Sequence, residues 1–353
     1  MRVFSEGKYM TTTRMIFPAV LLALFLNAST GYSFTALYAF GDSISDTGRN
    51  PPSQASSYFN GRYSNGPLWV EYLSASLGLP YNAANNFAVS GSTTSDLQSE
   101  IAGLPVSPNL PTALITIESG GNDFLQNANL GTNDPAWSII VSNAVLNLTN
   151  AIATLYADGA REFLVLNLFN LGQAPFFSAY SANYRTYVDS KVAAFNTQFE
   201  SVVSNANQQI PGLRIYVAGF NQLSSNILSA PANYGFTVST IGALQDPALT
   251  DKSFNGPGAN YVFWDPLHPT TKGHALLAAV AFQCVGVQLN VARSGTNFNL
   301  TVSNLYPTLP YTIQSSANLV TWSNYQTFTA VNTNAAVTVT NGTGARSFYR
   351  VEY

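Results

Sequence analysis

Short apolar runs alternate with segments of helical periodicity between residues 35 and 282, and this alternation constrains the fold more than any other feature. The apolar runs predict five strands, at Thr35–Phe40, Asn85–Gly91, Ala113–Glu118, Glu162–Leu168 and Leu213–Ala218. The periodic segments predict helices at Leu68–Leu77, Ser92–Ile101, Trp137–Asp158, Tyr184–Asn207 and Thr270–Phe282. Strands that alternate with helices form a parallel sheet with right-handed crossovers. The sequence therefore predicts an α/β fold, a three-layer α/β/α sandwich around a five-stranded parallel sheet.

The pattern changes near Val287, after which no helical period survives. Short alternating runs such as Phe298–Val302 and Tyr311–Gln314 are separated by turn residues. This pattern predicts a small all-β domain with antiparallel strands, arranged like a sandwich. We therefore expect an α/β domain at residues 34–286 and a β domain at residues 288–353. Three aromatic residues of the β domain fit either a carbohydrate-binding platform or ordinary core packing: Trp322, Tyr325 and Tyr349.

The first 33 residues have the pattern of a targeting segment. Basic residues precede an apolar run, Met15–Leu26, and small and polar residues follow it. This order matches the charged, apolar and cleavage regions of a secretory signal. The run is shorter than the roughly 20 residues of a membrane span, which leaves an uncleaved anchor as the alternative. We expect a signal peptide at residues 1–33, with Ala28, Ser29 and Ser33 all fitting the cleavage site, and a secreted or extracytoplasmic protein of bacterial origin.

The composition of the chain limits the kinds of partner it can bind and shows how it uses cysteine. Only 9% of the 353 residues are charged, against about 25% in typical soluble domains. The net charge is −3 and there is no basic tract, which argues against a nucleic-acid partner. Cys284 is the sole cysteine, so no intrachain disulfide forms. Its apolar surroundings predict a buried, unreactive thiol.

Residues suited to acyl transfer follow the predicted strand ends. Ser43 follows the first strand, Gly91 ends the second and Asn122 follows the third, while Asp265 and His268 precede the last helix. Open α/β sheets place reactive groups at the carboxyl ends of their strands, so these residues can meet at one edge. Acyl transfer needs a nucleophile, a base, a group that orients the base, and donors for an oxyanion. The chain has only 2 histidines, so the choice of base is narrow.

Four blocks in a fixed order carry a resemblance to a known family. They are Gly41-Asp42-Ser43-Ile44, Gly91, Gly121-Asn122-Asp123 and Asp265-Pro-Leu-His268. Together with the stretches Phe59–Leu73 and Tyr261–His274, they resemble the GDSL esterases and lipases of the SGNH hydrolase superfamily over roughly residues 36–282. The resemblance is to the branch shared by plant GDSL lipases and secreted bacterial esterases. It implies a flavodoxin-like hydrolase fold.

The resemblance also implies a role for each residue. Ser43 would be the nucleophile, His268 the general base and then the general acid, and Asp265 the residue that holds the imidazole. The oxyanion hole would consist of the backbone N–H groups of Ser43 and Gly91 and the side-chain amide of Asn122. Ile44 stands where the family name has leucine, a conservative apolar change.

Several of these residues also have a purely structural explanation. Ser43 is a residue type that caps helices, and His268 lies in a loop. Three aspartates suggest a metal site or a structural role: Asp42, Asp46 and Asp123. The three aspartates lie in turn-like stretches where Asp commonly bonds the local backbone, so we expect no metal and no cofactor. His274 lies in the first turns of the last helix and is predicted to be structural.

The sequence therefore predicts a secreted serine ester hydrolase that cleaves carboxylic esters through a Ser43 acyl-enzyme. Its substrate would be a small-molecule, lipid or acylated-carbohydrate ester, with membrane contact only through the signal segment or a lipid substrate. One alternative is an acyltransferase that uses the same acyl-enzyme. Another is a non-catalytic surface binding protein. The loops Pro51–Tyr63 and Thr237–Asn260 are expected to set the chain-length preference.

Overall fold

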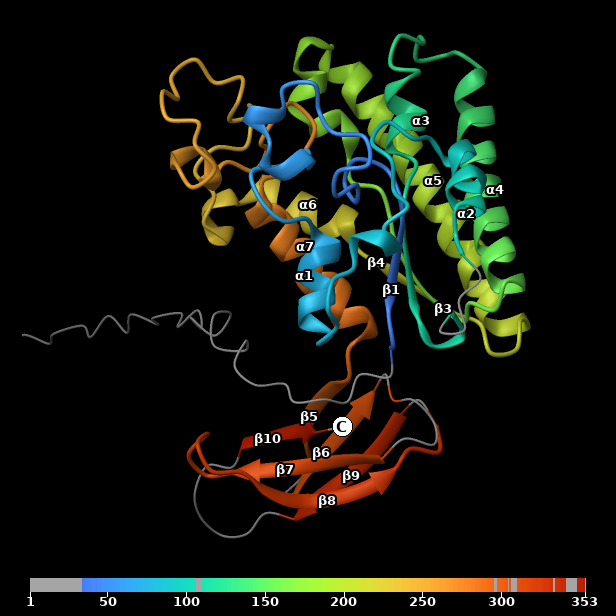
Figure 1. Ribbon diagram of the computed structural model, residues 1–353, viewed down its shortest axis with the longest axis vertical. Helices are drawn as coiled ribbons and strands as arrows, with labels where there is room; N and C mark the ends of the chain where they lie inside the picture. Colours follow the sequence, from blue (N-terminus) through green and yellow to red (C-terminus); the bar gives the residue numbers. More distant parts are fainter. Residues whose placement is uncertain are drawn as a thin grey trace, which may run out of the picture.

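The computed structural model describes residues 34–105, 110–294, 297–303, 305, 310–332, 334–340 and 348–352. The predicted signal peptide, residues 1–33, lies outside the described residues. Figure 1 shows an α/β part above a smaller β part. The sheet strands of the α/β part begin on the side next to the β part, so their carboxyl ends point away from it (Figure 1).

One parallel sheet organises the α/β part. Its strands are β1 (Leu37–Gly41), β2 (Leu114–Glu118), β3 (Glu162–Leu166) and β4 (Arg214–Ala218). They lie in the spatial order β1-β2-β3-β4, and every neighbouring pair is parallel. The predicted α/β fold with a parallel sheet between helices is confirmed.

The predicted number of five strands is wrong, because residues 85–91 do not form a strand. They follow a 3₁₀ turn at Ala83–Asn85 and make one bridge, between Asn86 and Ala39 of β1. Two backbone hydrogen bonds still reach β1, from the N–H of Phe87 to the Ala39 oxygen at 2.7 Å and from the N–H of Val89 to the Gly41 oxygen at 2.8 Å. The side chain of Asn86 makes the segment irregular, because its oxygen accepts the N–H of Ala88 at 3.0 Å and its amide donates to the backbone oxygen of Ser45 at 2.7 Å. The segment therefore lies along β1 without forming a regular strand.

Helices cover both faces of the sheet. They are α1 (Trp69–Ser76), α2 (Leu97–Ala102), α3 (Gly121–Leu125), α4 (Ala136–Ala157), α5 (Ala182–Gln209), α6 (Phe220–Ser229) and α7 (Thr271–Val285). Figure 1 shows α1, α6 and α7 on one side of the strands and α2, α4 and α5 on the other. Helices lie within a few residues of every range that periodicity predicted, because each predicted range has an apolar stripe that faces the sheet or another helix.

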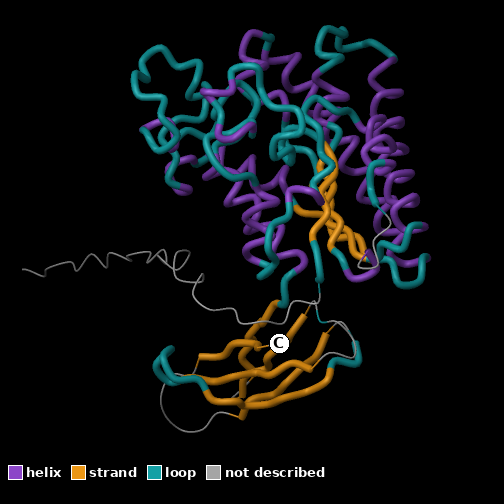
Figure 2. The backbone as a smooth tube through the Cα atoms, viewed as in Figure 1, coloured by secondary structure: helices purple, strands orange, loops and turns teal. Residues whose placement is uncertain are grey.

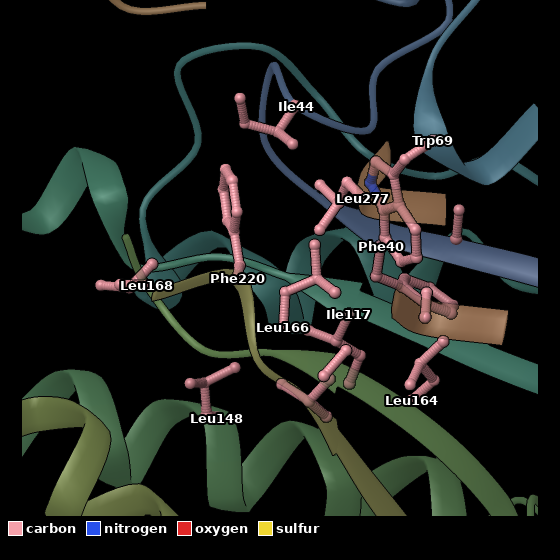
Figure 3. Close-up of a cluster of buried hydrophobic side chains, with 14 of the residues drawn as sticks. Phe40, Ile44, Trp69, Ile117, Leu148, Leu164, Leu166, Leu168, Phe220 and Leu277 are labelled. Carbon is pink, nitrogen blue, oxygen red and sulfur yellow. The ribbon is translucent and has the colours of Figure 1, made fainter. Parts of the chain in front are cut away.

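The core lies between these layers. All residues of β1, β2 and β3 are buried, as expected for strands covered on both faces. Figure 3 shows Phe40, Ile117 and Leu164 of the sheet together with Trp69 of α1 and Leu277 of α7. Each of these five side chains is at most 1% exposed, so the sheet edge that carries the polar residues rests on a rigid base.

Helix α4 is long and apolar enough to cross a membrane by length and composition. Core packing accounts for this character. It packs against α2 and α5, and its buried side is formed by Val141, Ala144, Leu148 and Ile152 among others.

The C-terminal part consists of antiparallel strands, as predicted, drawn in orange in Figure 2. The strands are β5 (Gln288–Ser294), β6 (Asn297–Ser303), β7 (Pro310–Ser316), β8 (Ser323–Thr329), β9 (Asn334–Thr340) and β10 (Phe348–Glu352). They form two sheets, ordered β5-β6-β9 and β10-β7-β8. One apolar cluster includes Leu300 and Val337 from the first sheet and Tyr311 and Ile313 from the second, and it is separate from the core of the α/β part.

The aromatic residues singled out in this part lie at its surface or edge. Tyr325 is 41% exposed, and its ring meets the ring of Tyr349 edge-on, with 6.1 Å between the centroids. Tyr349 also packs against the apolar cluster. The guanidinium of Arg350 lies over the ring of Trp322 at 4.4 Å.

Candidate active site

A glycine turn sets the position of Ser43. β1 ends in Gly41, whose φ of +127° is in the region that favours glycine. A Cβ atom there would lie 1.7 Å from the backbone oxygen of Glu118 in β2, so no other residue fits. The N–H of Asp42 donates to that same oxygen at 3.1 Å. The backbone therefore turns sharply out of the sheet after Gly41, and this turn places Ser43 at the carboxyl end of β1.

Ser43, His268 and Asp265 form one continuous hydrogen-bonded chain. The Oγ of Ser43 lies 2.7 Å from Nε2 of His268. The other ring nitrogen, Nδ1, lies 2.7 Å from Oδ2 and 2.8 Å from Oδ1 of Asp265. The side chains of His268 and Asp265 are only 12% and 6% exposed. This is the arrangement in which an imidazole takes the proton of a serine hydroxyl while a carboxylate holds the ring.

Asp265 also shapes the loop that carries His268. Its Oδ1 accepts the N–H groups of Leu267 and His268, at 2.8 Å each. This turn, made by a side chain and the backbone that follows it, brings the imidazole back to the carboxylate. Burial opposes ionisation of Asp265, but the charge of His268 and these hydrogen bonds bring the pKa of Asp265 below its usual value. Burial likewise opposes protonation of His268, but Asp265 and, to a smaller extent, Asp42 raise its pKa above 6.5.

The candidate oxyanion donors line the same cavity as Ser43 and His268. Gly91 has a φ of +91°, and a Cβ atom there would meet nothing within 4 Å, so the backbone conformation alone accounts for glycine. Asn122 lies in the first turn of α3, directly after the end of β2. Its Nδ2 donates to the backbone oxygen of Ser92 at 2.9 Å and, more weakly, to Oδ2 of Asp42 at 3.3 Å. The predicted site residues are therefore brought together at one sheet edge.

Both polar and apolar side chains line the cavity in front of Ser43. Its volume is about 330 Å³. The polar lining includes Ser43, Asn122 and His268 together with four other side chains: Asp42, Asn50, Ser90 and Glu118. The apolar lining comes from six side chains: Ile44, Leu125, Leu168, Phe169, Leu171 and Leu267. A largely apolar lining with a few polar groups is typical of small-molecule sites.

Comparison with known proteins agrees with the geometry. A family model described as GDSL-like lipase/acylhydrolase matches residues 37–281. The chain belongs to this family. A GDSL esterase/lipase of Arabidopsis thaliana is 27% identical over 312 residues, which covers 70% of this chain and 81% of the relative. The phosphatidylcholine-sterol acyltransferase of Aeromonas hydrophila is 25% identical over 319 residues, which covers 70% of this chain and 89% of the relative.

Among solved structures, an acetylxylan esterase of Geobacillus stearothermophilus matches with 17% identity and a TM-score of 0.43, covering 72% of this chain and 94% of the other. The GDSL family predicted from the four sequence blocks is confirmed by the family model. The chain is thus a carboxylic ester hydrolase of the GDSL family, which disfavours the alternative of a surface binder without activity.

Two tyrosines of the loop at residues 51–63 contact Asp265 and His268, and neither was predicted from the sequence as a site residue. The hydroxyl of Tyr58 donates to Oδ2 of Asp265 at 2.9 Å. The ring of Tyr63 packs on the imidazole of His268, with 4.8 Å between the centroids. The only signal in the sequence was the aromatic character of a loop without helical or strand period.

A cluster of buried carboxyl groups lies beside the turn that carries Ser43, and it was not predicted from the sequence. Asp42, Glu118 and Glu100 are 3%, 3% and 6% exposed. Oε2 of Glu100 accepts the N–H of Gly41 at 2.8 Å, and Asp42 and Glu118 are hydrogen-bonded to each other. Burial raises the pKa of all three, to about 8 for Glu100 and well above its usual value for Glu118. The one available signal was an acidic residue at the end of an otherwise apolar strand, ALITIE.

The aspartates considered as metal ligands bond N–H and hydroxyl groups of the protein, and only some of these groups are close in sequence. Oδ1 of Asp46 accepts the N–H of Gly48 at 2.8 Å, and Asp123 accepts both the N–H and the hydroxyl of Thr94. Within the described residues, no group of three or more His, Cys, Asp or Glu side chains is arranged to hold a metal ion.

The second histidine and the cysteine lie away from this chemistry. His274 is fully buried in α7, where burial lowers its pKa to about 3. Cys284 is half-buried rather than buried, because it lies near the end of α7, and burial still raises the pKa of its thiol.

Proposed function

We propose that this GDSL enzyme hydrolyses carboxylic esters through an acyl-enzyme on Ser43. The observation that carries the proposal is the chain of short contacts from Ser43 Oγ through both ring nitrogens of His268 to Asp265. A serine hydroxyl does not ionise near neutral pH, so it needs such a base beside it. Asp265 keeps the imidazole oriented and stabilises its charged form.

The reaction has two balanced halves. In the first, Oγ of Ser43 attacks the ester carbonyl carbon while its proton passes to Nε2 of His268. The imidazolium then gives this proton to the leaving alcohol as the C–O bond breaks. In the second half, water attacks the acyl carbon, again losing its proton to Nε2, and the proton returns to Oγ as the carboxylic acid leaves. His268 is therefore base and acid in turn in both halves.

The charge that forms on the carbonyl oxygen would be held by the N–H groups of Ser43 and Gly91 and the amide of Asn122. One N–H of the Asn122 amide is occupied by the Ser92 oxygen at 2.9 Å. The other makes only the long contact of 3.3 Å to Asp42, which an oxyanion would displace. Donors that are already fixed by the fold cost little reorganisation when the charge develops.

The substrate that fits best is an ester with an aliphatic acyl group. Six apolar side chains line the cavity next to Ser43, and they supply apolar surface against which an acyl chain can be buried. Burial of each methylene in such a lining contributes about 0.8 kcal/mol.

The test is hydrolysis of a nitrophenyl ester by the wild-type protein and by Ser43→Ala. We expect the variant to lose at least about 10³-fold in kcat while retaining its fold by circular dichroism. Equal rates in the two proteins would overturn the proposal.

A second candidate function is acyl transfer to an alcohol. It is favoured by the similarity to a relative named phosphatidylcholine-sterol acyltransferase. The first half-reaction would be identical, and an acceptor hydroxyl would replace water in the second. Product analysis with a competing alcohol decides between them: a new ester in excess of free acid supports transfer, and free acid alone supports hydrolysis.

We also propose that the protein is exported, since basic residues and the apolar run Met15–Leu26 precede the described domain. Expression of the full chain in a bacterial host should yield a protein outside the cytoplasm whose first residue lies between 28 and 35. Retention of the intact N-terminus in the cytoplasm would contradict this.

A further inference from the structure

Two neighbouring hydrogen bonds hold Tyr58 against Asp265. Its hydroxyl donates to Oδ2 of Asp265 at 2.9 Å, across 207 residues of sequence. The residues next to this pair are also bonded: Nε1 of Trp264 donates to the backbone oxygen of Ser57 at 2.9 Å. The Tyr58 ring packs against the buried cluster that contains Trp264 and touches the ring of Tyr63. The loop is therefore clamped to the segment that carries Asp265.

The hydrogen bonds of Asp265 show what Tyr58 contributes. Oδ1 accepts two backbone N–H groups, from Leu267 and His268. Oδ2 accepts Nδ1 of His268 and the hydroxyl of Tyr58. Within the described residues, Tyr58 is the only side chain besides His268 that bonds Asp265. It binds Oδ2, which lies 2.7 Å from Nδ1 of His268, while Oδ1 lies 2.8 Å from the same nitrogen. Tyr58 therefore competes with His268 for the charge on Oδ2.

We propose that Tyr58 is a positioning residue of the catalytic site, which fixes Oδ2 of Asp265 and limits the negative charge that this oxygen presents to His268. This inference rests on the proposed function of the Ser43 site. A hydroxyl that donates to an ionised carboxylate takes up part of its charge, and such bonds are among the strong ones. An Asp265 without this donor would attract a proton on His268 more strongly.

The Tyr58 hydroxyl stays protonated, and so can donate to Asp265, throughout the pH range in which His268 titrates. Burial and the neighbouring charge of Asp265 raise the pKa of Tyr58 far above its usual value, so it stays a proton donor. The other titratable groups that act on His268 are Asp42 from the β1 turn, Tyr63 from the same loop, and His274 from α7. None of them is altered by a change at position 58, so a shift at His268 would report the Tyr58 hydroxyl.

The experiment is an NMR titration of the histidine rings in wild type, Tyr58→Phe and Tyr72→Phe. The chain has only 2 histidines. His274, with a pKa of about 3, stays neutral across the range, and the His268 signal is identified by its loss in His268→Asn. Tyr72 is the matched control because its hydroxyl makes a bond of similar length, 2.8 Å, to Thr271 and does not touch Asp265.

We expect the pKa of His268 to rise by about half a unit to one unit in Tyr58→Phe and to stay in place in Tyr72→Phe. An unchanged or lowered pKa in Tyr58→Phe would overturn the inference, as would an equal rise in the control. If Tyr58→Phe fails to fold, a tyrosine fluorinated beside the hydroxyl, introduced at position 58 alone, gives the opposite test. It is a stronger donor and should lower the pKa of His268, and an unchanged value would overturn the inference.

Kinetics separate this role from simple anchoring of the loop. The acidic limb of kcat/KM should move upward with the His268 pKa in Tyr58→Phe. In an Asp265→Asn background the same change should have no further effect on kcat, because Tyr58 acts through Asp265. Equal losses in both backgrounds would show that Tyr58 only supports the fold. The titration needs no substrate, so its failure is distinct from a failure of the ester hydrolysis itself.

Discussion

The carboxyl group of Asp42, the residue directly before Ser43, is hydrogen-bonded to that of Glu118 at the end of β2, and each residue is 3% exposed. Two carboxylates in contact cannot both ionise at little cost, so the pair keeps a proton near neutral pH. Asp42 also accepts the N–H of Ile44 at 3.0 Å and the amide of Asn122 at 3.3 Å. The pair therefore connects the Ser43 turn to Asn122 while it carries at most one negative charge.

Glu100, which is hydrogen-bonded to Gly41, makes the stability of the protein depend on pH. Its pKa is about 8 in the folded protein against 4.5 ordinarily, so the folded state binds the proton more tightly than the unfolded state does. This contribution is fully present below pH 4.5 and is lost as the pH rises toward 8. Glu100→Gln keeps an oxygen for the Gly41 N–H and removes the ionisation. We expect it to raise the free energy of unfolding by ~2 kcal/mol at pH 8 and to change it little at pH 4.

Urea unfolding at the two pH values measures this difference. Glu71→Gln is a poor control because Glu71 pairs with Arg62. Glu200→Gln is a better one, because Glu200 is exposed on α5 and the glutamine keeps an oxygen for the Asn167 amide, which donates to Oε1 of Glu200 at 3.1 Å. It should change stability little at either pH. A Glu100→Gln protein that is less stable at pH 8 than wild type would contradict the argument.

Asn122→Ala should lower kcat by about 10²–10³-fold with a much smaller change in KM, because it removes a donor that acts on charge present only in the transition state. Asn127→Ala is the matched control. It removes an amide one turn further along, where Nδ2 donates to the Asp123 oxygen at 2.8 Å and does not line the cavity. Similar kcat values for wild type and Asn122→Ala would exclude Asn122 from the oxyanion hole.

Phe169 should limit the length of the acyl chain. It lines the cavity at Ser43 and also a second, apolar cavity of about 30 Å³ bounded by Phe220, Leu223 and Ile227. Phe169→Ala would join the two. We expect the ratio of kcat/KM for an octanoyl ester to that for a butanoyl ester to rise about tenfold, which corresponds to burial of about two further methylenes at about 0.8 kcal/mol each. A panel of nitrophenyl esters measures the ratio, and an unchanged ratio would place the acyl chain elsewhere.

Much of the fold and of the candidate site could be predicted because its signals are local. The apolar strands before Gly41 and Gly120, and the Asp-x-x-His block before the last helix, have short-range patterns that distant contacts do not override. Ser43, Gly91, Asn122, Asp265 and His268 all belong to such blocks, and the structure brings them to one sheet edge.

The remaining features depend on contacts that no local pattern encodes. The bond from Tyr58 to Asp265 joins residues 207 positions apart, and the raised pKa of Glu118 follows from burial by elements distant in sequence. The absence of a regular fifth strand has a local cause. The side chain of Asn86 bonds the backbone of its own segment, so this segment keeps only one bridge and two backbone hydrogen bonds to β1.

The central claim is that Ser43 carries the acyl group. The most direct measurement is mass spectrometry of the protein after inhibition by a fluorophosphonate, which transfers its phosphonyl group to an activated serine and releases fluoride. We predict that hydrolysis is lost at one adduct per chain, with the adduct on the peptide that contains Ser43 and absent in Ser43→Ala. Loss of hydrolysis with the adduct on another residue, or full labelling of Ser43 with hydrolysis intact, would contradict the account.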